Sequence, residues 1–532
     1  MNLRIGIVAL LLCLHLPVIA VALPFRTVAL SGQPAPGTPP GVVYAGFDNG
    51  IINENGTVVF SAGLAGPGVT AVHPSNAYGI WKEVAGVISK VVRSGEQAVG
   101  LPPGVNYYLP GASRVDGYGR VTFSAEAPDV SRHAIFSEVD GSLRLVARET
   151  EQFSGQPAGI RFNGLGSPLV NENGNMALIS WISGPGLPGG SYGIFTDRSG
   201  QLELVIKDED SAPGIPGARI LQLSAPAFND HGVLALHGRY TGGVFPNDHA
   251  VWTEQTGIFS LLARSGQAPG GLPAGVVFGP LDDPRINNAG EVMFHGALTG
   301  PGITSANDQA LWLHNGGEFQ FIAREGSPAA GIAAGANHGS NHYAYLNGAG
   351  EATFVGTLTG SAVNLQNDSA LWSQRGDTLR LIAREGDHAP GTPAGVMFGD
   401  FSRLGADSAF SVNNMSQVAF HVKLTGPGVT AVNDTGIWVT DLSGALRLVA
   451  REGDLFDVND DPMLEDLRTV FLTKLSGPGF NNAGELAIAL TFTDNSGGVF
   501  VISTAVPEPS FAILLATAVV FTRSRRRRGA VS

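Results

Sequence analysis

The chain contains the octapeptide Asn287-Asn288-Ala289-Gly290-Glu291-Val292-Met293-Phe294, and this pattern occurs eight times along the sequence. The fourth position is Gly in every copy but one, where Ser416 replaces it, and the eighth position always holds a large apolar residue. The copies begin at Asn53, Asp116, Asn171, Asn229, Asn287, Asn347, Asn413 and Asn481. A period of about sixty residues is typical of a repeat architecture rather than of several unrelated domains.

Two further features keep the same period. An aromatic residue follows each octapeptide by roughly twenty residues, at Trp81, Phe136, Phe195, Trp252, Trp312, Trp372, Trp438 and Phe500. A segment related to Leu-Ile-Ala-Arg-Glu-Gly, residues 381–386, comes about a dozen residues later in seven units. Its eighth copy lies at the other end of the chain, between Val28 and Gly32.

The repeated segments have the pattern of short β-strands. Apolar residues alternate with small ones after each octapeptide turn, as at Val58 and Phe60, and a period of two indicates a half-buried strand. Asn and Gly supply the backbone angles that a tight hairpin needs. Gly and Pro together make up 106 of 532 residues, which fits a protein rich in turns. Each unit therefore predicts about four antiparallel strands.

The displaced copy indicates how the units are arranged. The eighth unit lacks its own last strand, whereas a surplus strand of that type lies at the N-terminus. Only a ring gives both features a purpose, because the N-terminal strand can complete the last sheet and remove two exposed edges. We therefore predict an all-β fold, a closed eight-bladed β-propeller over residues 23–505. Tandem β-domains and a β-solenoid are the alternatives.

The repeated residues are expected to be scaffold. The repeated Asn is predicted to bond the backbone of its own turn, and the aromatic residues are predicted to pack between neighbouring sheets. Arg384 with Glu385, and Arg324 with Glu325, could form ion pairs. A localised function should then lie where the units differ from one another.

Residues 1–22 have the pattern of a secretory signal peptide. A basic residue, Arg4, precedes an apolar run that ends in a small-x-small cleavage pattern, with Ala20 and Ala22 at the small positions. The single cysteine, Cys13, lies within this run, so the mature chain would contain no disulfide. We expect a secreted protein.

The C-terminal end, residues 506–532, has three parts in a fixed order. Val506-Pro507-Glu508-Pro509 is followed by a short apolar segment and then by the basic cluster Arg525, Arg526, Arg527 and Arg528. This order resembles the PEP-CTERM sorting signal of exported bacterial proteins. The resemblance implies an exosortase-type processing enzyme as a partner, contact with the membrane through a C-terminal transmembrane helix, and a final location at the cell surface or outer envelope. The apolar segment is shorter than is usual for that signal.

The octapeptide repeat resembles the tandem NxxGxxxF family of bacterial surface proteins, over roughly Leu23 to Thr504. That family has no assigned biochemical activity, so the resemblance implies architecture and location but no catalytic residue.

Charge and motifs exclude several classes of function. Without both terminal segments the chain has 26 basic and 44 acidic residues, a net charge of −18, which argues against nucleic acid as a partner. We find no nucleophile, metalloprotease or phosphate-loop motif, and we predict no catalytic residue. Asp457, Asn459 and Asp461 place oxygen atoms at alternate positions, as in a Ca²⁺-binding loop, although the EF-hand Gly and closing Glu are absent. Ca²⁺ is the only cofactor that the sequence suggests.

These observations predict a non-enzymatic, surface-sorted component of the bacterial envelope or exopolysaccharide matrix, with an exopolysaccharide or a surface protein as its partner. Two alternatives remain open. The first is a polysaccharide lyase or hydrolase, which would need unit-specific His, Tyr, Asp or Glu residues that converge at the ring axis. The second is a spacer without a ligand.

Overall fold

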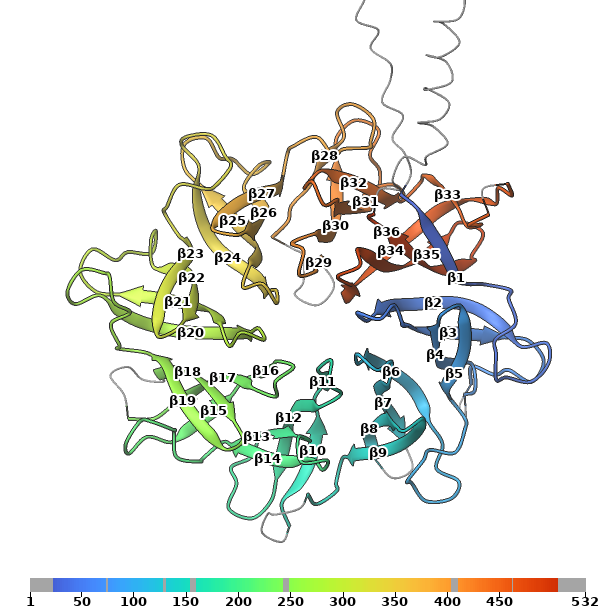
Figure 1. Ribbon diagram of the computed structural model, residues 1–532, viewed down its shortest axis with the longest axis horizontal. Coiled ribbons are helices and arrows are strands. Elements are labelled where there is room, and N and C mark those ends of the chain that lie inside the picture. The colour runs from blue at the N-terminus through green and yellow to red at the C-terminus, as the bar shows by residue number, and fades with distance from the viewer. Residues whose placement is uncertain are drawn as a thin grey trace, which may run out of the picture.

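The computed structural model describes residues 23–505 except 73–74, 128–130, 154–158, 243–247, 403–409 and 462. These ranges contain β-strands and no α-helix. The strands form eight antiparallel sheets arranged in a ring (Figure 1). The predicted eight-bladed β-propeller is confirmed, and the alternatives of tandem β-domains and a β-solenoid are wrong. Both terminal segments that carry the predicted signals, 1–22 and 506–532, lie outside the described residues.

The first four blades follow one another along the chain, each from its innermost to its outermost strand. Blade 1 contains β2 (Val43–Ile52), β3 (Val58–Ala65), β4 (Tyr78–Val84) and β5 (Val87–Arg93). Blade 2 contains β6 (Tyr108–Val115), β7 (Val121–Ala127), β8 (Ser131–Val139) and β9 (Ser142–Arg148). Blade 3 contains β10 (Arg161–Leu165) and β11 (Leu169–Val170), which both pair with β12 (Met176–Ser183), then β13 (Ser191–Thr196) and β14 (Glu203–Lys207). Blade 4 contains β15 (Ile220–Leu223) and β16 (Ala227–Phe228), which both pair with β17 (Leu234–Tyr240), then β18 (Asp248–Gln255) and β19 (Ile258–Arg264).

The other four blades repeat this order. Blade 5 contains β20 (Val277–Ile286), β21 (Val292–Thr299), β22 (Gln309–Asn315) and β23 (Glu318–Arg324). Blade 6 contains β24 (Asn337–Leu346), β25 (Ala352–Thr359), β26 (Ser369–Arg375) and β27 (Thr378–Arg384). Blade 7 contains β28 (Met397–Phe398) and β29 (Phe410–Val412), which both pair with β30 (Val418–Thr425), then β31 (Thr435–Thr440) and β32 (Leu446–Arg451). In blade 8 the innermost strand is β34 (Leu467–Phe480), followed by β35 (Glu485–Phe492) and β36 (Gly497–Ser503). The short strand β33 (Leu455–Asp457) pairs with the first residues of β34, on the side away from β35.

The N-terminal strand β1 (Phe25–Leu30) closes the ring. It pairs antiparallel with β36, with Phe25 opposite Ile502, and so forms the outermost strand of blade 8 as the sequence predicts. Arg26 extends from β1 to blade 1, where its Nη1 lies 2.9 Å from Glu83 Oε2. The Ser503 N–H donates to Pro24 O at 2.7 Å, so the two ends of the described chain lie side by side. Closure therefore joins blade 8 to blade 1 through both ends of the chain.

The core lies within the blades and between them, as expected for the repeated aromatic residues. One buried cluster, for example, joins Trp81 of blade 1 to Val499 of blade 8. The five repeated tryptophans are at most 1% exposed. Each indole N–H also donates to a backbone carbonyl oxygen. For Trp81, Trp252 and Trp438 the acceptor is the carbonyl oxygen of a proline in the connection that leads into the blade. Burial of these large side chains with a satisfied N–H stabilises each junction.

The octapeptide turn joins the innermost strand of each blade to the second strand. Its fourth residue adopts a left-handed conformation, with φ of 79° at Gly56. Glycine takes this conformation without steric cost, which explains its repetition. Ser416 has φ of 55° at the same position and is the one copy in which a side chain accepts this strain.

Candidate binding site at the ring axis

The repeated Asn does more than cap its own turn. In the first unit, Asn53 Oδ1 accepts the N–H groups of Asn55 (3.1 Å) and Thr57 (2.8 Å), as the sequence predicts. Its Nδ2 donates across the blade junction to the carbonyl oxygen of Asp116, the first residue of the next octapeptide, at 2.6 Å. Sequence reasoning missed this second bond. A turn cap needs only an acceptor, which Asp or Ser also provides, so the near-invariance of Asn was the signal that a donor is required.

These hydrogen bonds from the Asn side-chain amides link the turns into a ring. Six of the eight described junctions have the bond, namely 53 to 116, 171 to 229, 229 to 287, 347 to 413, 413 to 481, and 481 back to 53. Asp116 has no amide, and its Oδ2 instead accepts from Arg120 Nε at 2.6 Å. Asn287 turns its Nδ2 to Glu291 Oε2 at 2.7 Å. We name this set of turns the octapeptide ring.

The second residue of the octapeptide adds another set of links. Asp230 Oδ1 accepts the N–H of Glu172 at 2.8 Å, and Glu54 Oε2 accepts the N–H of Asn482 at 2.9 Å. Asn288, Asn414 and Asn482 do the same for the preceding blade. Carboxylates from blades 1, 3 and 4 thus stand at positions where the other units carry an amide or Gly.

The repeated Arg is also scaffold, but not in the predicted way. Arg384 Nε donates to the carbonyl oxygen of Asn367 at 3.0 Å, and Arg324 Nε donates to that of Asn307 at 3.1 Å. Among the described residues neither Arg pairs with the Glu that follows it, so that expectation is wrong. Glu385 instead accepts the hydroxyl of Ser369 at 3.0 Å. Adjacent residues of a strand point to opposite faces, which separates the two charges.

The axial wall differs from unit to unit. We define it as the surface of the innermost strands β2, β6, β11, β16, β20, β24, β29 and β34. Figure 1 shows these strands reaching toward the centre of the ring, whereas β10, β15 and β28 lie farther out. On β24, Tyr343 and Tyr345 are 39% and 43% exposed, whereas the intervening Ala344 and the following Leu346 are buried in the blade. The two tyrosines therefore face away from the blade core, as alternate residues of a strand do.

The electrostatic surroundings place Tyr345 near the axis. Protein encloses its hydroxyl from many sides, which raises the pKa, and the charges of Glu54, Asp230 and Glu172 raise the pKa further while Arg285 lowers it. These four charged groups belong to blades 1, 4, 3 and 5, and Tyr345 belongs to blade 6. Only a position close to the axis is near to all of them.

Glu172 has the most perturbed carboxyl group of this set. Burial raises its pKa to about 7, and the neighbouring charges of Asp230, Glu54 and Asp116 raise it as well. Burial also raises the pKa of Glu54. Crowded carboxylates disfavour one another's ionisation, so Glu172 exchanges its proton near neutral pH while it stands beside other acidic groups.

A second polar group lies at the junction of blades 4 and 5, around the buried His237 of β17. His237 Nδ1 lies 2.9 Å from Ser224 Oγ and 3.5 Å from Asp282 Oδ1, and its Nε2 lies 3.0 Å from His249 Nδ1. His249 Nδ1 also contacts the carbonyl oxygen of Leu281 at 2.8 Å, and a carbonyl can only accept. His249 Nδ1 therefore carries a proton, His237 Nε2 accepts it, and neutral His237 holds its own proton on Nδ1. That nitrogen faces Ser224, so in this arrangement His237 cannot take the serine proton as a catalytic base.

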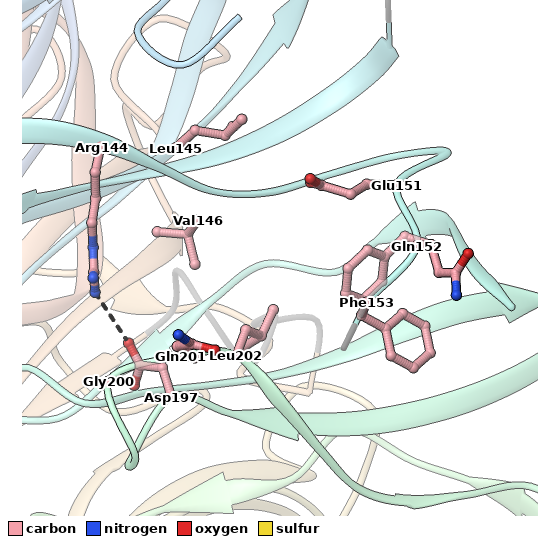
Figure 2. Close-up of a pocket in the computed structure, with 11 residues that line it drawn as sticks. Arg144, Leu145, Val146, Glu151, Gln152, Phe153, Asp197, Gly200, Gln201 and Leu202 are labelled. Atoms are coloured by element: carbon pink, nitrogen blue, oxygen red, sulfur yellow. Dashed lines mark ion pairs between the residues drawn. The ribbon is translucent and has the colours of Figure 1, made fainter. Parts of the chain in front are cut away.

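A shallow pocket lies at the outer side of the ring between blades 2 and 3. Figure 2 shows Arg144 and Asp197 at one side and Phe153 at the other. The Arg144 and Asp197 side chains approach to 4.0 Å across the blade junction. Its volume of about 260 Å³ is below the range of about 300 to 1,000 Å³ that is usual for small-molecule sites. We therefore place the candidate site at the axis.

The loop predicted to bind Ca²⁺ uses its oxygen atoms for its own backbone. Asp457 Oδ1 accepts the N–H groups of Asn459 and Asp466, Asn459 Oδ1 accepts that of Asp461, and Asp461 Oδ1 accepts that of Met463. The described residues contain no group of three His, Cys, Asp or Glu side chains with a metal-binding arrangement. A Ca²⁺ site at Asp457, Asn459 and Asp461 stays a prediction.

The predicted cleavage residues Ala20 and Ala22 lie outside the described residues, as do all residues of the predicted sorting motif. Within the described ranges, no helix has the length and apolar character needed to cross a membrane.

The fold and the axial site define an eight-bladed β-propeller whose repeated positions form the scaffold. By sequence, the chain belongs to DUF7453, a family of unknown function, whose model matches residues 52–513. No curated protein matches the chain in sequence.

The chain is similar in structure to several solved propellers at low identity. The β-propeller domain of the Trilobed protease from Pyrococcus furiosus is 10% identical, with a TM-score of 0.38, and the match covers 77% of this chain and 99% of that one. An oligogalacturonate lyase in complex with manganese is 12% identical, with a TM-score of 0.36 and coverages of 88% and 98%. A PL25 ulvan lyase is 11% identical, with a TM-score of 0.31 and coverages of 74% and 94%.

Proposed function

We propose that this protein is an exported, surface-sorted bacterial propeller that binds a glycan of the envelope or exopolysaccharide matrix at its ring axis. The observation that carries the proposal is the convergence of side chains that the units do not share. Tyr345, Arg285, Glu54, Glu172 and Asp230 come from five blades, and the four charged groups are close enough to Tyr345 to shift its pKa. Exposed tyrosines beside carboxylates suit a sugar ring, because the aromatic face contacts its C–H groups and the oxygen atoms bond its hydroxyls.

The repeated residues support the proposal by contrast. The octapeptide Asn, the aromatic residues and the Arg all have structural partners, so their repetition needs no ligand. The acidic surface is compatible with neutral or cationic glycans and unfavourable for nucleic acid.

A polysaccharide array tests the proposal. We expect the purified chain to bind at least one surface or matrix polysaccharide, and Tyr345→Ala to abolish this binding without lowering the melting temperature. Ile258→Ala, at a position on the outermost strand β19 that is 72% exposed, is the matched control. Absence of binding to every polysaccharide would indicate a spacer without a ligand.

The sorting proposal has its own test. Deletion of residues 506–532 should release the protein into the medium, whereas full-length protein should remain with the envelope until an exosortase-type enzyme processes it. Equal release of both forms would contradict a sorting role for the Pro507-Glu508-Pro509 segment and its basic cluster.

A polysaccharide-active enzyme is a second candidate, and one observation favours it. The Glu172 carboxyl group, with a pKa of about 7, can donate a proton near neutral pH, while Asp230 and Glu54 lie close enough to influence it. A pair of carboxyl groups with different roles is the basis of glycoside hydrolysis. Release of reducing ends from a bound polysaccharide, lost in Glu172→Gln, would establish this activity.

A further inference from the structure

The two exposed tyrosines of β24 are specific to blade 6. Tyr343 and Tyr345 lie four and two residues before Asn347, and no other unit has an aromatic residue at either position. Tyr345 pairs with Thr353 of β25, whereas Tyr343 lies within the register irregularity between Asn341 and Ala344. Both tyrosines are exposed and the intervening Ala344 is buried, which places the two rings on the same side of the strand. Two rings on the same side of this strand form a platform near the C-terminal end of β24, which Figure 1 shows pointing toward the centre of the ring.

A large aromatic side chain is normally buried or partnered in a scaffold, as the five repeated tryptophans are. Tyr343 and Tyr345 keep 39% and 43% of their surface exposed. Among the ring contacts of the described residues, neither tyrosine has an aromatic partner, whereas His338, earlier on β24, packs on Trp372 at 4.8 Å. The platform is therefore available to a ligand, and a chain of sugar rings offers the flat C–H faces that stack on it.

The charge around the platform selects among sugars. Three carboxyl groups, those of Glu54, Glu172 and Asp230, interact with Tyr345, against one guanidinium, that of Arg285. Asp230 and Glu54 are held in place by backbone N–H groups of neighbouring turns. Fixed negative charge in a partly enclosed site attracts a cation and repels a uronate.

We propose that the platform of Tyr343 and Tyr345, together with Glu54, Glu172 and Asp230, binds an oligosaccharide of amino sugars whose amines are free and protonated. This inference rests on the proposed function and names its ligand class. The sugar rings stack on the tyrosines, and the ammonium groups lie against the carboxylates of the octapeptide ring.

Calorimetry with three oligosaccharides of equal length tests the proposal on the full chain. The probes are a glucosamine oligomer, its N-acetylated form and a galacturonate oligomer. We expect the glucosamine oligomer to bind at least tenfold more tightly than the N-acetylated form, and the galacturonate oligomer not to bind. A tenfold ratio corresponds to about 1.4 kcal/mol of binding free energy.

Variants assign the two parts of the site. Tyr345→Ala should weaken glucosamine-oligomer binding tenfold or more, whereas Tyr345→Phe, which keeps the ring, should retain most of it. Asp230→Asn should reduce the preference for the free amine, and Glu318→Gln, at an exposed position on the outer strand β23, should leave it unchanged. An unchanged melting temperature excludes misfolding as the cause.

Three outcomes would overturn this inference. Tighter binding of the N-acetylated or galacturonate oligomer, lost in Tyr345→Ala, would retain a glycan-binding axis but reject the amino-sugar class. Binding of the glucosamine oligomer that Tyr345→Ala leaves unchanged would place the ligand elsewhere. No binding of any of the three, although the polysaccharide array is positive, would also reject the amino-sugar class, whereas a negative array would reject the proposed function itself.

Discussion

The octapeptide ring and the axial wall lie next to each other but follow opposite rules. Asn347 of the ring and Tyr345 of the wall are two residues apart in the chain, at the end of the same blade strand. The Asn is 1% exposed and forms hydrogen bonds with both its own turn and the next blade. The tyrosine is 43% exposed, and charged groups from four other blades shift its pKa. The difference teaches that repetition marks the residues that hold the blades together, and that departures from it mark the residues available for a ligand.

Removal of the closing strand should have the largest effect on this comparison, because it damages the scaffold and leaves the wall residues in place. Deletion of residues 23–31 removes the ladder on β36 and exposes the edge of blade 8. We expect a larger fall in melting temperature than any single substitution causes, together with aggregation. A peptide of residues 23–32 added in trans should restore part of the loss by pairing with β36. An unchanged melting temperature would contradict closure by this strand.

Asn413→Ala should weaken the octapeptide ring by about 1 to 3 kcal/mol, because it leaves buried backbone groups without partners. Thermal unfolding measures the loss. Asn413 donates to the carbonyl oxygen of Asn481 at 3.0 Å and accepts two N–H groups of its own turn.

A double variant serves as the control for this prediction. Asn413→Asp alone should be no better than Ala, because a carboxylate then faces a carbonyl oxygen. Adding Gln417→Arg reproduces the Asp116 and Arg120 pair of the second unit and should recover stability. Full stability of Asn413→Ala would show that the hydrogen bonds from Asn side chains to the next blade are dispensable.

Glu172→Gln should have a smaller effect that depends on pH. The folded-state pKa of about 7 lies above the ordinary value of 4.5, so the folded protein binds more protons than the unfolded chain between these values. Stability should therefore fall as pH rises from about 4.5 to 7. The variant should lose this part of the pH dependence and melt above the wild type at pH 8, whereas Glu318→Gln should follow the wild-type profile. Parallel profiles for Glu172→Gln and the wild type would indicate an ordinary, solvated Glu172.

Tyr345→Ala should have the smallest effect on stability, since its side chain is substantially exposed and has no aromatic partner within the described ranges. We expect a melting temperature within about 1 °C of the wild type, measured beside Asn413→Ala. A loss as large as that of Asn413→Ala would remove the distinction between wall and scaffold.

Most of the fold could be predicted from the sequence because the information is periodic. Eight copies of one turn, one aromatic position and one strand type define the blade, and the displaced copy at Val28 indicates closure. The hydrogen bond from the Asn53 side-chain amide to the Asp116 carbonyl oxygen was harder to predict from the sequence, because a turn cap alone accounts for Asn at that position.

The candidate site could not be predicted, for a geometric reason. Glu54 and Tyr345 are almost 300 residues apart in the chain and interact only because the ring brings their blades to a common axis. No local pattern marks such a meeting. The sequence could only indicate that function should lie where the units differ, and Tyr343 and Tyr345 are such a difference.

The position of β36 between β1 and β35 has a mechanical consequence. The last residues of β36 lie next to Pro24, so a force applied to the chain beyond Ala505 would act on this strand. Without β1, β36 would be an edge strand held only by its hydrogen bonds to β35, which could break one after another. With β1 in place, a force along β36 loads two hydrogen-bond ladders together. If the tail tethers the protein to a surface, the N-terminal strand acts as a clamp against shear at the point where the load enters.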